Sequence, residues 1–135
     1  RSGFHPYFHI PGKAKLSASV TKAFVTNSRM LPVDTKEIQS LEVALPDTSK
    51  LDNGYFGENW RVMVEGEEFS FEITQRNLNH LMLYRPSPSL FVDGSEGIAI
   101  EPQSAPANAF NTELEKHLIQ PGETKDFWFQ IRMLG

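Results

Sequence analysis

Cysteine is absent from this sequence of 135 residues. The absence excludes a disulfide framework and any chemistry that depends on a thiolate, and it suits the reducing cytoplasm, where we expect the protein to be located. Long apolar runs are missing as well, and none approaches the length of a membrane-spanning helix. We therefore expect no membrane partner.

Runs of lysine or arginine are also missing. The sequence has 13 lysine and arginine residues against 17 aspartate and glutamate residues, which gives a formal net charge of -4. Because nucleic acids and anionic membrane surfaces are usually bound by an excess of positive charge, we expect neither as a partner.

Long helices have little room, because nine glycines and nine prolines interrupt the sequence at regular intervals. Alternation of apolar and polar residues predicts half-buried strands instead. Strands are expected at 16–20, at 62–64 and 69–73 as a hairpin around Glu65-Gly66-Glu67, at 80–85, 90–92 and 97–101, and at 127–133. Short helices are expected near Thr35–Leu41 and Asn111–Leu118, with a turn at 120–123. Short, regularly spaced strands predict an all-β protein, an antiparallel β-sandwich.

The segment FHPYF at residues 4–8 is the first candidate for chemistry. Because Pro6 restricts the residue before it, His5 should project from an extended backbone. A histidine can donate or accept a proton near neutral pH, although a lone histidine among aromatic residues is more often part of the packing. On these residues alone both interpretations stay open.

Two carboxylates complete the set of candidates. Glu101 ends an apolar strand before Pro102, where it either points into solvent or faces a polar cleft. Asp52 opens an Asp-Asn-Gly sequence that is typical of a turn, and it is either a turn former or a hydroxyl-binding group on a loop. The four histidines lack the spacing of a metal site, and no phosphate-binding glycine loop is present.

These segments together resemble one family, the aldose 1-epimerases. Residues 4–8 resemble its H-x-Y-F/W motif. Residues 98–106 (IAIEPQSAP), followed by Ala109-Phe110-Asn111, resemble its E-P/T-Q … P-x-A motif. The segment IQPGE at 119–123 and the aromatic last strand look like the C-terminal end of a family member. The resemblance covers residues 1–135 but only about the second half of such an enzyme.

The resemblance implies a mutarotase that interconverts the α and β anomers of a free hexose, within a galactose-mutarotase-like β-supersandwich. Glu101 would be the general base and His5 the general acid, on opposite sides of the sugar. Asp52 would bind sugar hydroxyls, Tyr7 or a tryptophan would stack on the ring, and Gln103 would contact the substrate. The reaction needs no metal or organic cofactor.

The resemblance also implies that the N-terminal half of the same protein is a partner, present as a second chain, and that residues 1–135 alone have little or no activity. Two alternatives remain open. One is a noncatalytic carbohydrate-binding β-sandwich. The other is a hexose-phosphate mutarotase relative, which would need a cationic cluster for which Arg61, Arg76 and Arg85 are the candidates.

Overall fold

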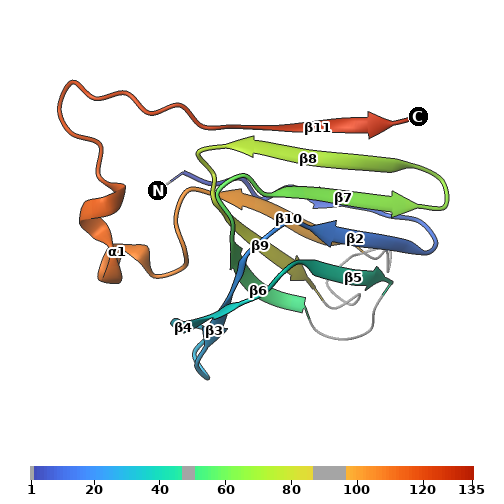
Figure 1. The fold of residues 1–135 in the computed structure, drawn as a ribbon, viewed down its shortest axis with the longest axis horizontal. Coiled ribbons are helices and arrows are strands. Elements are labelled where there is room, and N and C mark those ends of the chain that lie inside the picture. Colours follow the sequence, from blue (N-terminus) through green and yellow to red (C-terminus); the bar gives the residue numbers. More distant parts are fainter. Residues whose placement is uncertain (1, 47–50, 87–96) are drawn as a thin grey trace.

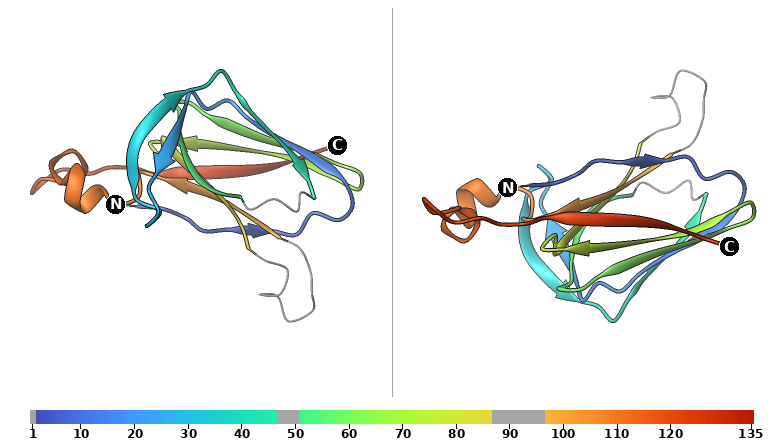
Figure 2. Two further views of the ribbon diagram at one scale, coloured as in Figure 1. Left: turned by 90° about the horizontal axis from the view of Figure 1, so that it is seen from below. Right: turned by 90° about the horizontal axis from the view of Figure 1, so that it is seen from above.

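The protein is an antiparallel β-sandwich, as the alternation of its strands predicts. The computed structural model describes residues 2–46, 51–86 and 97–135. Within these residues the strands form one sheet of six and one of five, with a shared apolar core between them (Figures 1 and 2). All pairings within the two sheets are antiparallel.

The six-stranded sheet carries the site described below. In spatial order its strands are β1 (Tyr7–Phe8), β10 (Ile98–Gln103), β9 (His80–Arg85), β6 (Leu51–Phe56), β3 (Lys22–Thr26) and β4 (Pro32–Glu37). The five-stranded sheet consists of β11 (Trp128–Leu134), β8 (Ser70–Arg76), β7 (Arg61–Gly66), β2 (Ala14–Ala18) and β5 (Leu41–Leu45). Helix α1 (Ala109–Thr112) and the 3-10 helix η2 (Leu114–His117) lie beyond one end of the sandwich (Figure 1).

The core follows directly from the period of two along each strand. Leu81 and Leu83 of β9 are fully buried between the sheets, and Val62 and Val64 of β7 approach them from the other side. Each such side chain contributes about 1.5–3 kcal/mol when it leaves water. The residues between them in sequence necessarily face outward, so the apolar pattern also decides which side chains reach the outer surface of each sheet.

Several expected elements are confirmed. The hairpin is formed by β7 and β8, in register from Arg61 opposite Thr74 to Glu65 opposite Ser70. The strands at 80–85 and at the C-terminus are present, as is a short helical segment at 109–117. The turn at 120–123 is closed by a hydrogen bond from the Glu123 amide to the Gln120 carbonyl at 2.9 Å. The strand expected at 90–92 lies outside the described residues.

Two local expectations are wrong, both because pairing between strands overrides local preference. No helix forms at 35–41: strand β4 occupies 32–37 and pairs with β3, and β5 begins at Leu41. Asp52-Asn53-Gly54 is not a turn but lies inside β6, which is paired with β9 along its whole length and with β3 at one end.

No helix in the described ranges is long and apolar enough to cross a membrane.

Replacement of Trp60 tests the core. Its side chain is 1% exposed, and its indole Nε1 donates a hydrogen bond of 2.8 Å to the buried carbonyl of Leu78. Trp60→Phe removes this donor and part of the packing, so we expect the free energy of unfolding to fall by about 2–3 kcal/mol. Urea denaturation followed by circular dichroism measures the change. Trp128→Phe is the matched control, since Trp128 is 43% exposed and should shift stability by less than about 0.5 kcal/mol. Equal losses in both variants would contradict this account.

Candidate active site

The N-terminal segment forms the outermost strand of the six-stranded sheet. Residues 2–8 run antiparallel to 98–104, with Gly3 opposite Gln103 and Tyr7 opposite Ala99. The main-chain bonds that hold it run from the Phe4 amide to the Pro102 carbonyl at 3.0 Å and from the Ile100 amide to the Pro6 carbonyl at 3.2 Å. Pro102 therefore lies within the ladder and does not end the strand, contrary to the expectation for that segment.

This register places His5 directly opposite Glu101. The flanking pairs, residue 4 with 102 and residue 6 with 100, keep one hydrogen bond each, because Pro102 and Pro6 have no amide hydrogen for the reciprocal bond. His5 and Glu101 lie between these bonded pairs, where opposing side chains approach most closely. A cross-strand contact between the two side chains is the direct consequence.

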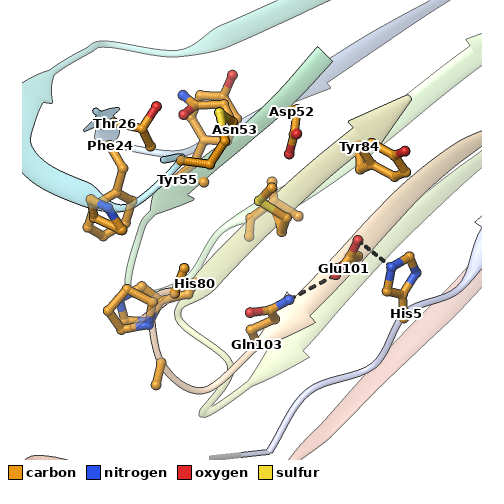
Figure 3. Close-up of a pocket in the computed structure, with 18 residues that line it drawn as sticks. His5, Phe24, Thr26, Asp52, Asn53, Tyr55, His80, Tyr84, Glu101 and Gln103 are labelled. Atoms are coloured by element: carbon orange, nitrogen blue, oxygen red, sulfur yellow. Dashed lines mark hydrogen bonds and ion pairs between the residues drawn. The ribbon is translucent and has the colours of Figure 1, made fainter. Parts of the chain in front are cut away.

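The carboxylate of Glu101 is held from two directions (Figure 3). His5 Nε2 lies 3.1 Å from Glu101 Oε1, and Gln103 Nε2 donates a hydrogen bond of 2.9 Å to Oε2. The Glu101 side chain is 6% exposed whereas that of His5 is 54% exposed. A buried carboxylate thus meets an imidazole that is open to the exterior.

These groups lie at one end of a cavity of about 320 Å³ on the outer face of the six-stranded sheet. The sequence alternation explains its lining, because the residues that alternate with the core leucines of β9 are His80, Met82 and Tyr84. In the same rows, Asp52 lies opposite Tyr84, Gly54 and Glu101 lie opposite Met82, and Gln103 lies opposite His80. The cavity volume falls at the lower end of the range of about 300–1,000 Å³ that small-molecule sites occupy.

Asp52, expected on a loop, reaches the cavity from strand β6. It lies on the far side of the cavity from Glu101, near Tyr84 (Figure 3). A strand holds a side chain more rigidly than a loop does, so the two carboxylates keep a fixed separation across β9.

Tyr7 contacts His5 but is not part of the cavity lining. Its ring stacks on the His5 imidazole with a centroid distance of 4.9 Å. Partial burial raises the pKa of the Tyr7 hydroxyl, and the nearby Tyr84 and Glu101 raise it further, so Tyr7 stays protonated at neutral pH. Neither tryptophan can provide the stacking face in this cavity: Trp60 is in the core and Trp128 is on the five-stranded sheet.

Sequence reasoning missed His80 and Phe24. The His80 ring packs between two aromatic rings, 5.8 Å from Phe24 and 5.2 Å from Phe56 between centroids. Both residues line the cavity, because their side chains lie on the same face of the six-stranded sheet as Gly54 of β6. The alternation at 80–85 could have identified His80. Because Leu81 and Leu83 are apolar and expected in the core, His80, Met82 and Tyr84 must face the outer surface of the sheet.

The cavity lining contains two carboxylates, Asp52 and Glu101, and two histidines, His5 and His80. Among the residues that the structure describes, no lysine or arginine lines it. The arginines considered for a phosphate site lie elsewhere: Arg61 and Arg76 are on the five-stranded sheet, and Arg85 lines a separate small cavity. Within the described part of the chain, no three metal-ligating side chains gather in one place.

Comparison with known proteins identifies the family and the fold. The sequence model of the aldose 1-epimerase family matches residues 1–132. The fold is similar to the crystal structure, at 1.59 Å resolution, of a candidate aldose 1-epimerase from Escherichia coli K12, with a TM-score of 0.64 and 14% sequence identity. The match covers 98% of this chain and 50% of that one, so the chain spans about half the length of that structure. At this identity the likeness shows the fold alone. No curated protein sequence matches the chain.

Proposed function

The chain belongs to the aldose 1-epimerase family, and from this premise we propose that it is the acid–base half of an isomerase that interconverts the α and β anomers of a free hexose. The observation that carries the proposal is the contact of 3.1 Å between His5 and Glu101 at one end of the cavity. It brings a proton donor and a proton acceptor together where a small polar ligand fits.

Mutarotation moves only protons and one ring bond. Glu101 removes the proton from the O1 hydroxyl while His5 protonates the ring oxygen O5, so the C1–O5 bond breaks and a C1 aldehyde forms. After rotation about the C1–C2 bond, ring closure on the other face returns both protons. No electron leaves the sugar and no group is transferred, so the chemistry requires no metal or organic cofactor.

The observed geometry refines the arrangement expected from the sequence. His5 and Glu101 lie side by side at one end of the cavity and not on opposite sides of it (Figure 3). O1 and O5 are bonded to the same carbon, so two adjacent protein groups can serve both atoms from one end. The sugar therefore enters with C1 toward Glu101 and its remaining hydroxyls along the cavity.

Gln103 is proposed to position the base. Its hydrogen bond to Oε2 fixes the rotation of the Glu101 carboxylate and leaves Oε1 directed at His5. A contact between Gln103 and the substrate, expected from the sequence, remains compatible with its place in the lining. Asp52 is proposed to accept hydrogen bonds from sugar hydroxyls, and Tyr7 to hold the His5 ring by stacking.

A further segment is proposed to complete the site, namely the N-terminal half of the same protein. The support lies on β11, where Ile131 and Met133 are in register with the core residues Ile73 and Phe71 but remain 44% and 61% exposed. Apolar side chains on the core face of a sheet are normally covered. The half-length match to the Escherichia coli structure agrees with a missing layer.

Denaturing mass spectrometry of the natural protein tests this arrangement. We expect either one polypeptide of about twice 15.3 kDa or this chain together with a second of similar size. In line with that, residues 1–135 alone should accelerate mutarotation little above the spontaneous rate. A single natural species of 15.3 kDa with the turnover of a complete enzyme would contradict the proposal.

Free hexose is favoured over hexose phosphate, because the carboxylates of Asp52 and Glu101 line the cavity and no lysine or arginine of the described ranges does. A phosphate placed there would lie near two acidic groups and could pair only with a protonated histidine. The noncatalytic alternative predicts that the same sugars bind without faster mutarotation. Measurement of the mutarotation rate therefore distinguishes it from the enzyme.

Replacement of Glu101 tests the mechanism. In the natural protein that carries this chain, Glu101→Gln and His5→Gln should each lower kcat by about 10²–10⁴-fold, the usual contribution of a general acid or base. Polarimetry of freshly dissolved α-glucose and α-galactose measures the rate, and calorimetry shows whether sugar still binds. Glu65→Gln, an exposed carboxylate on the other sheet, is the control and should leave the rate unchanged. Sugar binding without any acceleration by the unaltered protein would leave a noncatalytic binding module.

Gly54 keeps the cavity floor flat. A methyl group at this position would lie 3.3 Å from Phe24 Cδ2 and 3.9 Å from Met82 Sδ, on the face where the sugar is expected. We expect Gly54→Ala to weaken glucose binding about three- to tenfold by calorimetry. The free energy of unfolding should change by less than about 1 kcal/mol, since alanine is tolerated in strands. Unchanged glucose affinity would place the sugar elsewhere.

A further inference from the structure

A second cavity lies at one end of the sandwich, under the segment that leads from β10 to β11. Figure 1 shows this segment leaving the sandwich after β10 and returning to it at β11. The cavity has a volume of about 360 Å³, within the range of about 300–1,000 Å³ that small-molecule sites occupy. Among the described residues it shares no lining residue with the cavity beside Glu101. We call it the terminal cavity.

The lining of the terminal cavity is cationic. It includes Lys116, His117 and Lys125, and none of the described residues that line it is an aspartate or a glutamate. The cavity proposed for the sugar has the opposite composition, with the carboxylates of Asp52 and Glu101 and no lysine or arginine among its described lining residues. The two cavities therefore favour ligands of opposite charge.

The acidic neighbours of the two lysines leave both ammonium groups able to bind a ligand. Lys116 pairs with Glu113 at 3.1 Å and Lys125 with Glu123 at 3.8 Å, and all four side chains are at least 35% exposed. Exposed pairs of this kind add little stability, because water solvates both ions. An ammonium group also has three hydrogens to donate, of which Lys125 uses one on the carbonyl of Leu118 at 3.1 Å.

Neutral hydrogen-bonding groups complete the polar part of the lining. Asn77 and Asn79 come from the connection between β8 and β9, and Ser2 and Ser104 lie on either side of the outermost strand pairing. The Ser104 hydroxyl oxygen accepts a hydrogen bond of 2.8 Å from the Ser2 amide, so its own hydrogen is directed elsewhere. Lysine, serine and asparagine side chains together are typical donors to phosphate oxygens.

One wall of the terminal cavity is apolar. It is formed by Ile119 and Phe127, from the segment before β11. An inorganic ion would leave this wall without a partner, whereas the organic part of a phosphate ester can pack against it.

We propose that the terminal cavity binds a small phosphate ester, with its phosphate held by Lys116 and Lys125 and its organic part against Phe127. Binding there should also strengthen the pairing of residues 2–8 with β10. The binding itself does not depend on the function proposed above. The effect on activity does, because it takes the acid–base role of His5 and Glu101 from that proposal.

The link to the acid–base pair runs through the two serines. The Ser104 amide donates a hydrogen bond of 2.8 Å to the Ser2 carbonyl, directly beside the bridge between Gly3 and Gln103. A ligand that contacts both serines finds both of them only while the strands are paired. It therefore shifts the population toward the paired state, in which His5 faces Glu101.

Calorimetry on the natural protein, at constant ionic strength, tests the site with glycerol 3-phosphate and with glycerol as its neutral control. Glycerol 3-phosphate should bind and glycerol should not. Lys116→Gln and Lys125→Gln should each weaken glycerol 3-phosphate about tenfold, the usual effect of losing one hydrogen bond to a charged group. Lys15→Gln is the matched control, since Lys15 pairs with Glu65 at 3.1 Å on the other sheet and its loss should leave the affinity unchanged.

Asn79→Asp separates loss of binding from loss of folding. The substitution is nearly isosteric and keeps the main-chain hydrogen bond of 3.0 Å from the Gly57 amide to the carbonyl of residue 79. It places a carboxylate in the lining, so it should abolish binding of glycerol 3-phosphate while circular dichroism stays unchanged. Equal affinity for glycerol 3-phosphate and glycerol, or unchanged affinity in the lysine variants and in Asn79→Asp, overturns the site.

Hydrogen exchange and glucose mutarotation, measured on the same samples, test the link to the edge strand. At ten times the dissociation constant, glycerol 3-phosphate should slow exchange of the Phe4 amide by up to about tenfold and raise the mutarotation rate, with neither effect in Asn79→Asp. Binding without slower exchange leaves the site and overturns the link. Slower exchange without any mutarotation supports the site and the link and overturns the proposed catalysis. Mutarotation without binding of glycerol 3-phosphate overturns this inference alone.

Discussion

The pairing of residues 2–8 with β10 is the constraint on which the candidate site depends. Its register, fixed by Gly3 opposite Gln103 and Tyr7 opposite Ala99, brings together two residues that are 96 positions apart in the sequence, His5 and Glu101. A shift of one residue would turn the His5 side chain to the other face of the sheet and away from Glu101. The proposed acid–base pair thus depends on the main-chain hydrogen bonds that fix this register.

The alternation of side chains along each strand supplies both the core and the cavity. Inward residues of β6, β9 and β10 form the core against the five-stranded sheet, and the outward residues of those strands form the floor of the cavity. The site is therefore attached to interior strands of the six-stranded sheet, which gives its carboxylates fixed positions.

Much of the fold could be predicted from the sequence, because the alternation at 62–73 and 80–85 reports burial directly and the alternation at 127–133 marks a strand. Local signals failed where long-range pairing decides the conformation: Asp52-Asn53-Gly54 has the composition of a turn but lies in a central strand, and residues 35–37 form an edge strand and not a helix. His5, Glu101 and Asp52 could be selected as candidates from residue type and family resemblance. Their side-by-side arrangement could not, since it depends on the register of strands that are distant in sequence. His80 and Phe24 carry no motif and become visible only when the outer face of the sheet is assembled.

The two prolines beside the site have a consequence for how the protein loses function. Because Pro6 and Pro102 each remove an amide hydrogen, the outermost strand is joined to β10 at these positions by half the hydrogen bonds that an ordinary ladder would have. Such an edge opens at a lower free energy than the core strands do. Fraying of residues 2–8 would withdraw His5 from Glu101 while the sandwich stays folded. Heat or mild denaturant should therefore abolish activity before it unfolds the protein. Substitutions that strengthen or weaken this edge strand could then change activity without changing global stability.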